Sequence, residues 1–182
     1  MLTQMDRTKA VVLIVDLQEK LLPAITGATA CVAASARLVA GAKALGVPVL
    51  VAEQYPAGLG HTCPEIATLM EDMPRCVEKM AFSACVPAIL DAIALQQRQQ
   101  IIIAGVETHV CVQQTVLDLL RRGLRVWVCA DAVGSRHELD REIALKRMRH
   151  AGAVVTTVES VLFELLGEAG TEDFKKILKI VK

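Results

Sequence analysis

Short apolar runs and longer helical patterns alternate along the chain, and this alternation restricts the fold more than any other feature. The apolar runs are rich in β-branched residues, and turns or helical patterns separate them. We expect six strands, at residues 10–15, 47–52, 76–80, 100–104, 125–130 and 153–157. We expect helices at residues 28–45, 87–96, 110–122, 138–150, 158–166 and 174–181. Strands that alternate with helices form parallel sheets through right-handed crossovers.

The composition supports a sheet that is covered on both faces. Hydrophobic residues make up 53% of the chain and aromatic residues only 3%, so the core must consist mainly of Ala, Val, Leu and Ile. Continuous apolar strands are typical of parallel sheets with helices on both faces. The sequence therefore predicts an α/β fold, a three-layer doubly wound sandwich with a mainly parallel sheet of about six strands. We expect a single domain over residues 1–182.

Charge and cysteine content argue against several classes of function. The 20 basic and 20 acidic residues cancel, so no global field attracts nucleic acid or an anionic membrane. No apolar run reaches the length of a membrane span, and Asp16 interrupts the first one, unlike a signal peptide. The six cysteines form no Cys-x-x-Cys pair, and free thiols are typical of a reducing compartment. We therefore expect a cytoplasmic protein without nucleic-acid or membrane partners.

Chemically active side chains follow several of the predicted strands. Asp16 follows the first strand, Lys79 lies near the end of the short third strand, and Cys111 comes after the turn that follows the fourth. Residues 53–55 follow the second strand, and Asp131 ends the fifth. In an open parallel sheet, ligands bind beyond the carboxyl ends of the strands. An acid, a base and a thiol are therefore expected at one edge of the sheet.

Cys111 is the strongest candidate nucleophile among the cysteines. It lies in the first turn of a predicted helix, and a helix N-terminus and a nearby ammonium group both lower the pKa of a thiol. Lys79 would hold the thiolate, while Asp16 would take its proton and pass it to a leaving group. Each residue alone also has a structural interpretation: Asp16 as a helix cap, Lys79 as a surface side chain and Cys111 as a core residue.

Four motifs, in this order and spacing, give the chain a family resemblance. They are Val-Leu-Ile-Val-Asp-Leu-Gln (12–18), Glu-Lys-Met-Ala-Phe-Ser (78–83), Gly-Val-Glu-Thr-His-Val-Cys-Val (105–112) and Leu-Asp-Leu-Leu-Arg-Arg-Gly (117–123). With them, the chain resembles the isochorismatase-like hydrolase superfamily over nearly its whole length. Two further segments resemble the small isochorismatase domain-containing proteins, Glu-Gln-Tyr-Pro-Ala-Gly-Leu-Gly (53–60) and Phe-Lys-Lys-Ile (174–177).

The resemblance implies a catalytic site. The catalytic Asp, Lys and Cys of the family correspond to Asp16, Lys79 and Cys111. In the amidase branches the Cys attacks a carbonyl or nitrile-like carbon and forms a covalent intermediate. The family's non-proline cis peptide would join Val106 to Glu107, and the backbone N–H groups of Glu107 and Cys111 would then form an oxyanion hole.

The resemblance also bears on metal content and on the substrate pocket. Nicotinamidases of this family bind a metal through an Asp-x-His segment after the second strand, where this chain has Glu-Gln-Tyr-Pro at 53–56. His61 and one glutamate would make a poor metal site, so we expect no metal and no cofactor. Three residues are expected to contribute to the pocket walls, namely Gln54, Tyr55 and His109.

Three functions are compatible with these features. The favoured one is a cysteine-dependent hydrolase of a small amide or related acyl compound, acting through a covalent thioester-type intermediate. The second is a non-catalytic binding or thiol redox-responsive protein on the same scaffold, because a low-pKa Cys111 would also suit a thiol sensor. The third is isochorismatase-type vinyl ether hydrolysis, which the presence of Cys111 disfavours. We expect a small-molecule substrate and a homo-oligomer, at least a dimer.

Overall fold

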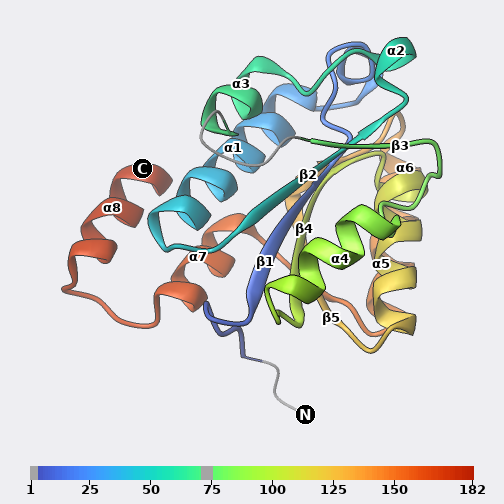
Figure 1. Cartoon of the computed structure of the whole chain (residues 1–182). Helices are drawn as coiled ribbons and strands as arrows, with labels where there is room; N and C mark the ends of the chain where they lie inside the picture. Colours follow the sequence, from blue (N-terminus) through green and yellow to red (C-terminus); the bar gives the residue numbers. More distant parts are fainter. Residues whose placement is uncertain (1–3, 71–75) are drawn as a thin grey trace.

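A computed structural model of the chain, which describes residues 4–70 and 76–182, has a sheet at its centre (Figure 1). In the described part of the chain, six parallel strands pair in the order β3-β2-β1-β4-β5-β6. They are β1 (Ala10–Val15), β2 (Val49–Gln54), β3 (Val77–Lys79), β4 (Gln100–Val106), β5 (Arg125–Gly134) and β6 (Val154–Thr156). The predicted α/β fold with a six-stranded sheet is confirmed.

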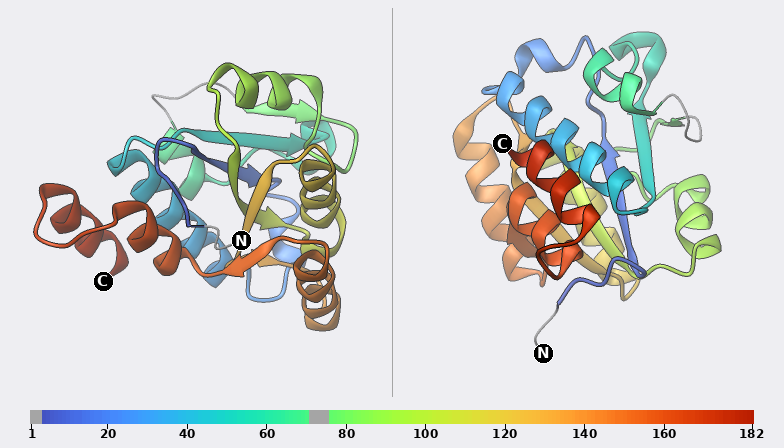
Figure 2. Two further views of the ribbon diagram at one scale, coloured as in Figure 1. Left: turned by 90° about the horizontal axis from the view of Figure 1, so that it is seen from below. Right: turned by 90° about the vertical axis from the view of Figure 1, so that its left-hand side faces the viewer.

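Helices cover both faces of the sheet (Figure 2). On one face lie α1 (Ala28–Ala44), α3 (Pro64–Ala67), α7 (Val158–Leu166) and α8 (Glu172–Val181), and on the other lie α4 (Pro87–Leu95), α5 (Gln113–Arg121) and α6 (Glu138–His150). Shorter helical segments are 3₁₀ turns at Leu22–Ala24 and Thr68–Met70, α2 (Pro56–Leu59), and a π-helical turn at Thr108–Val112. No described helix combines the length and the apolar character that a membrane span requires.

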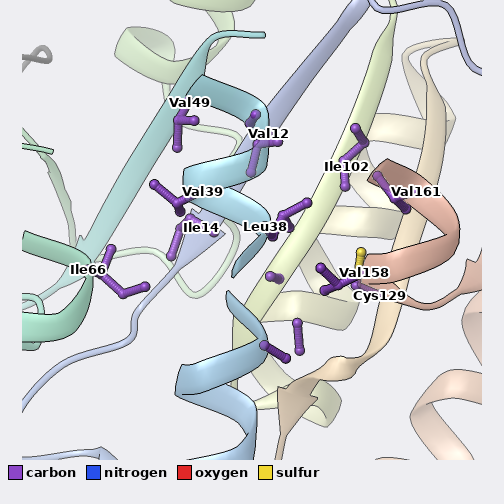
Figure 3. Packing of buried hydrophobic residues seen from close by; sticks show 14 of the residues in the cluster. Val12, Ile14, Leu38, Val39, Val49, Ile66, Ile102, Cys129, Val158 and Val161 are labelled. Atoms are coloured by element: carbon purple, nitrogen blue, oxygen red, sulfur yellow. The ribbon is translucent and has the colours of Figure 1, made fainter. Parts of the chain in front are cut away.

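Alternation along β1 builds a core on each face of the sheet. All six residues of this strand are buried. Val12 and Ile14 pack with α1 and α7 on one face (Figure 3), while Val11 and Leu13 pack with α4 and α5 on the other. Each fully buried Val, Leu or Ile side chain contributes about 1.5–3 kcal/mol of transfer free energy, so the central strand is a rigid support for residues at its end.

The fifth strand differs from the prediction. It does not end at Asp131 but continues to Gly134, with a shift in its pairing to β4 between Ile103 and Gly105. The Asp131 carboxylate accepts a hydrogen bond from the backbone N–H of Val158 at 2.9 Å. It therefore satisfies the N-terminus of α7, and its expected place among the chemically active residues is wrong.

The segments beside the candidate site also differ in detail from their predicted form. β2 starts two residues later than expected and extends through Gln54. The loop that follows it contains α2. The helix predicted from residue 110 begins earlier, as the π-helical turn, and becomes α-helical at Gln113.

Candidate active site

The candidate site lies where the strand order reverses, between β1 and β4. Helices that follow two such strands lie on opposite faces of the sheet, and this opens a crevice beyond the carboxyl ends of the strands. Asp16 follows β1 in this crevice, and Glu107 follows β4. Gly105 permits the close approach of the two strands, because its φ is +129° and an added Cβ would overlap the backbone of Val15.

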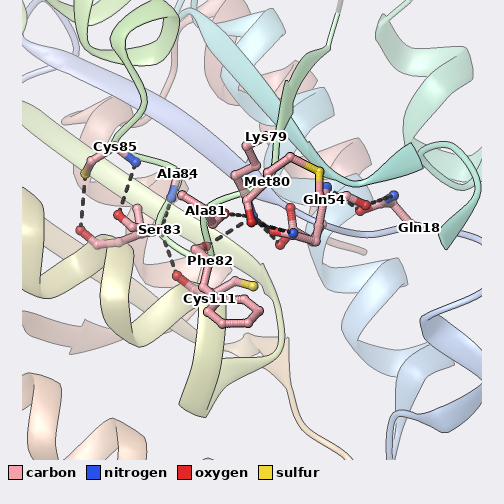
Figure 4. Close-up of polar contacts among 12 residues, drawn as sticks. Gln18, Gln54, Lys79, Met80, Ala81, Phe82, Ser83, Ala84, Cys85 and Cys111 are labelled. Carbon is pink, nitrogen blue, oxygen red and sulfur yellow. Dashed lines mark hydrogen bonds and ion pairs between the residues drawn. The ribbon is translucent and has the colours of Figure 1, made fainter. Parts of the chain in front are cut away.

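Asp16 and Lys79 form a fully buried ion pair, with 2.8 Å between Asp16 Oδ2 and Lys79 Nζ. Lys79 Nζ also donates to Gln54 Oε1 at 2.8 Å and to the carbonyls of Phe82 and Ala81 at 3.1 and 3.3 Å (Figure 4). An ammonium group has three protons, so these four oxygen atoms use its whole donor capacity. The pair is held rigidly, and the loss of either member would leave a buried charge without a partner.

The environment of Cys111 raises the pKa of its thiol to about 12 from an ordinary value of 9.0. Burial is the main cause, and the negative charge of Asp16 adds to it, whereas Lys79 acts in the opposite direction. The expectation of a lowered pKa is therefore wrong, because desolvation of the thiolate outweighs the attraction of the ammonium group. The resting thiol is protonated at neutral pH.

Asp16 is the nearby group that can receive this proton. Burial raises the pKa of Asp16 above its usual 3.8, although Lys79 and the Cys111 thiol both lower it. Within the described part of the chain, no hydrogen bond reaches Asp16 Oδ1. The carboxylate and the thiol are nevertheless close enough for each to shift the pKa of the other. A carboxylate with a raised pKa is better suited to accept and return a proton near neutral pH.

Backbone and side-chain contacts fix the segment that carries Cys111. Cys111 lies in the π-helical turn before α5, and its side chain is almost fully buried. Its carbonyl accepts a hydrogen bond from Thr115 Oγ1 at 2.6 Å. The same hydroxyl oxygen accepts from the Ala84 N–H at 2.8 Å. Thr115 therefore ties the thiol-bearing turn to the chain segment that follows Lys79.

A pocket of about 120 Å³ joins the candidate residues. Its polar wall includes Asp16, Gln54, Glu107 and Cys111. The remaining wall is apolar and consists of Leu21, Leu59, Phe82 and Val110. The sequence did not assign these residues to a pocket, although Leu59, Phe82 and Val110 lie within quoted motifs, because a motif does not show which of its side chains face a pocket.

Glu107 has two roles that the sequence did not separate. The peptide bond between Val106 and Glu107 is cis. The side-chain carboxylate of Glu107 accepts hydrogen bonds from the backbone N–H and from Nε of Arg136, at 3.1 and 3.0 Å. The charge of Glu107 is thus paired at the rim of the pocket, although only its backbone was expected to matter.

Of the three predicted pocket residues, Gln54 borders this pocket and the other two do not. Tyr55 is half exposed and borders a separate cavity of about 420 Å³, because the chain turns at Tyr55 (φ 38°) to enter α2. His109 Nδ1 lies 3.0 Å from Ser135 Oγ, so its ring is engaged elsewhere. Neither side chain lines this pocket, although the cavity beside Tyr55 is also bordered by Lys79, so contact of Tyr55 or His109 with substrate stays a prediction.

Gln18 is a buried positioning residue that the sequence did not single out. Its Nε2 donates to the carbonyls of Gln54 and Gly60, at 3.0 and 2.6 Å, and its Oε1 accepts from the Gln54 N–H at 2.7 Å. Gln18 therefore fixes the backbone of Gln54, whose side chain binds Lys79 (Figure 4). A usable signal was present, since Gln18 is a polar residue two positions after Asp16.

Glu53 and His61, expected from the sequence to make a poor metal site, have other partners. Glu53 Oε1 accepts hydrogen bonds from the N–H and the hydroxyl of Thr62, both at 2.6 Å, and Oε2 lies 3.3 Å from His61 Nδ1. Burial acts to raise the pKa of Glu53, but the contacts with Thr62 and His61 outweigh it and lower the pKa. Within residues 4–70 and 76–182, no group of three or more His, Cys, Asp or Glu side chains is arranged to hold a metal ion.

Known proteins are similar to this chain in sequence and in fold. A family model described as the isochorismatase domain matches residues 10–160. The chain is 43% identical, over 168 residues, to isochorismatase domain-containing protein 1 of Salmo salar. That match covers 92% of this chain but only 59% of the salmon protein, so the chain spans less than two thirds of the length of this relative.

Solved structures agree with this assignment. The MAR1 ribonuclease from Caenorhabditis elegans has a TM-score of 0.91 and 40% identity, covering 98% of this chain and 92% of that chain. YcaC from Pseudomonas aeruginosa, with hexane-2,5-diol and covalent acrylamide, has a TM-score of 0.91 and 28% identity, covering 99% and 91%. YcaC from Escherichia coli is described as an octameric hydrolase of unknown specificity. It has a TM-score of 0.91 and 27% identity, covering 99% of this chain and 91% of that chain. The chain belongs to the isochorismatase domain family.

Proposed function

We propose that this chain is a cysteine-dependent hydrolase of a small amide or related acyl compound, with Cys111 as nucleophile. The observation that carries this proposal is the pocket that Cys111 and Asp16 share at the β1–β4 crevice, where Asp16 is also paired with the buried Lys79. Nucleophilic catalysis needs a thiol, a base within reach and a group that holds the base in place. The site contains one residue suited to each task.

The first half of the reaction forms an acyl-enzyme. Cys111 Sγ attacks the substrate carbonyl carbon while its proton moves to the Asp16 carboxylate, so a C–S bond forms and the carbonyl electrons move to oxygen. The backbone N–H groups of Glu107 and Cys111 would stabilise this oxyanion. As the oxyanion collapses, the C–N bond breaks, Asp16 returns the proton to nitrogen, and the amine or ammonia leaves a thioester on Cys111.

The second half regenerates the thiol. A water molecule attacks the thioester carbon and loses a proton to Asp16, the C–S bond breaks, and the proton returns to sulfur. The buried ammonium group of Lys79 keeps Asp16 ionised before each proton transfer, because its charge lowers the pKa of that carboxyl. Transfer during attack also explains how a thiol with a pKa near 12 can act at neutral pH.

Two comparisons support this reaction. The P. aeruginosa YcaC structure contains covalent acrylamide, a small amide bound to that protein. The E. coli YcaC is described as a hydrolase. A sensor thiol must ionise without help from a base, whereas attack that transfers the proton to Asp16 does not need a low pKa, so the raised pKa of Cys111 favours the hydrolase over the redox-responsive alternative. Vinyl ether cleavage remains a lesser alternative in which Asp16 would be essential and Cys111 dispensable.

Self-association and cytoplasmic location are part of the same proposal. The octameric description of E. coli YcaC supports a homo-oligomer, and Met80, Leu95 and Leu139 are large apolar side chains that are mostly exposed in the single chain. Burial of such side chains between subunits would be favourable. Sedimentation equilibrium tests this, and a mass equal to that of one chain would contradict it.

The test of the proposed activity is a screen of small primary amides for release of ammonia. Cys111→Ala and Asp16→Asn should each abolish turnover, and brief mixing of a turned-over amide with wild type should give an acyl adduct by intact mass. Cys76→Ala is the matched control, since Cys76 is a half-buried thiol outside the pocket. Release of ammonia that survives Cys111→Ala would overturn the thiol mechanism.

A further inference from the structure

The pocket beside Cys111 is small, and the two charged side chains that line it among the described residues, Asp16 and Glu107, are each paired with a cation. We propose that it admits only uncharged molecules of about the size of benzene or smaller, and that Leu59 and Phe82 set this limit. This inference rests on the proposed hydrolase function, because limits on size and charge define the substrates only if the protein is a hydrolase. Its test, however, measures only access to the Cys111 thiol.

The volume of the pocket gives the size limit. A dry cavity of about 150 Å³ lined by apolar side chains holds one benzene molecule, and this pocket measures about 120 Å³. Ligand pockets for drug-sized molecules measure roughly 300–1,000 Å³. Because the pocket is open to solvent on one side, this volume limits the part of a ligand that lies beside Cys111, where a short aliphatic acyl group fits and a substituted ring does not.

The apolar wall is fixed, so the pocket does not widen easily. The backbone N–H of Leu21 donates to the Gln18 carbonyl at 3.1 Å, and the Leu59 carbonyl accepts from the Lys20 N–H at 3.1 Å. The Phe82 carbonyl accepts from Lys79 Nζ. The backbone of each of these residues is thus tied either to the segment after β1 or to the buried ion pair.

Leu59 and Phe82 are the wall residues whose truncation should destabilise the protein least. Leu59 is only partly buried, and the side chain of Phe82 is half exposed although it borders the pocket with Cys111 (Figure 4). A truncation at either site widens the mouth of the pocket and leaves both hydrophobic cores intact, since neither residue belongs to them.

The charges around the pocket give the second limit. Asp16 is paired with Lys79, and Glu107 is paired with Arg136. All donor capacity of Lys79 is used by four oxygen atoms. An anion that entered would lose its water shell and find two carboxylates and no free cation. Burial of an unpaired charge is strongly unfavourable, so neutral molecules are selected.

Alkylation of Cys111 by two reagents of similar size tests the charge limit. Iodoacetamide is neutral and iodoacetate is anionic, and peptide mass spectrometry reads the modification of Cys111 against that of glutathione in the same mixture. The glutathione-normalised preference for iodoacetamide should be at least about tenfold at Cys111. The half-buried Cys85, which is influenced by one acidic and one basic residue, Asp118 and Arg122, should show a much weaker preference. Equal normalised rates at Cys111 would overturn the charge limit.

Alkylation by acrylamide and by N-phenylacrylamide tests the size limit. In wild type, Cys111 should react with acrylamide and resist the larger reagent, and Leu59→Ala or Phe82→Ala should raise the relative rate of the larger reagent. Leu139→Ala is the matched control, because Leu139 is exposed on α6 and lies outside the pocket. Equal normalised rates of the two reagents in wild type, or no gain in either variant, would overturn the role of these walls.

The two proposals can fail separately. If Cys111 shows both preferences but no amide is hydrolysed, the size and charge limits stand and the proposed activity fails. If amides are hydrolysed irrespective of their size and charge, the activity stands and the limits fail.

Discussion

The thiol of Cys111 and the carboxyl of Asp16 are linked by the effect that each has on the ionisation of the other. Because the Asp16 charge raises the pKa of Cys111, Asp16→Asn should lower that pKa and shift alkylation by iodoacetamide to lower pH. The same variant should lose amide turnover, since the proton acceptor is gone. If Cys111 becomes more reactive in this variant while amide turnover is lost, Asp16 acts as the base. If neither changes, Asp16 is only a structural cap.

In wild type the alkylation profile has a predicted shape. The thiolate fraction grows about tenfold with each unit of pH below the pKa, and burial raises the pKa of Cys111 from 9.0 to about 12. The rate should therefore still rise steeply near pH 9, where an ordinary thiol begins to level off. Mass spectrometry of samples quenched at successive times measures this rate. An alkylation rate that levels off below pH 9 would contradict a protonated resting thiol.

Lys79 is expected to contribute to stability through the pair that it forms with Asp16. Lys79→Met removes the only cation that contacts this carboxylate among the described residues, and loss of one partner of a buried pair costs about 3–5 kcal/mol. Urea unfolding at neutral pH measures this free energy. Lys146→Met is the control, since Lys146 pairs with Glu142 at 3.7 Å on the surface and such pairs contribute about 0–1 kcal/mol. Equal losses in the two variants would rule out the buried pair as a special contributor.

At the scale of elements, Thr115 connects α5 to the segment after β3. Its hydroxyl donates to the Cys111 carbonyl and accepts from the Ala84 N–H, and it is fully buried. Thr115→Val keeps the shape but leaves both backbone groups without this partner, which should cost about 1–3 kcal/mol. Thr115→Ser retains the hydroxyl and should be markedly more stable than the Val variant in the same unfolding assay. The opposite order would show that the hydroxyl does not tie these elements together.

Periodicity and composition predicted most of the elements because they depend on local patterns. β1, α6 and α7 have the predicted boundaries, since apolar runs and amphipathic spacing define them along the chain itself. The extent of β5 was missed because Asp131 looked like a strand terminator. Its carboxylate instead binds the N-terminus of α7, a contact between elements that are distant in the sequence.

The candidate site was predicted unevenly for the same reason. Residues after strand ends must meet at one edge of a parallel sheet, and Asp16 and Lys79 do form an ion pair there. The pKa of Cys111 was predicted in the wrong direction because burial cannot be read from position in a helix. Leu59 and Phe82 lie in quoted motifs but were not assigned to the pocket wall, because tertiary hydrogen bonds place the segments that carry them.

At the scale of the whole molecule, the balance of charges predicts that the protein does not bind nucleic acid. The chain has 20 basic and 20 acidic residues, and basic residues on α6 pair within the helix, as Arg141 does with Glu138 at 2.7 Å. Affinity for nucleic acid depends on many unpaired cations. Although the C. elegans neighbour is called a ribonuclease, we expect neither binding nor cleavage of labelled single-stranded RNA at physiological salt. Micromolar binding in fluorescence anisotropy would contradict this expectation.

Gln18 has a consequence for the engineering of this scaffold. It forms hydrogen bonds with main-chain atoms at the two ends of the loop after β2, namely those of Gln54 and Gly60. Residues 56, 57 and 59 can therefore be randomised in a library while the same three hydrogen bonds keep Gln54, and through it Lys79, in register. Tyr55 and Gly58 are kept, because a Cβ on Gly58 would overlap the Tyr55 ring. Such a library would vary the pocket wall through Leu59, while Gln18, which lies outside the loop, stays unchanged and holds its ends.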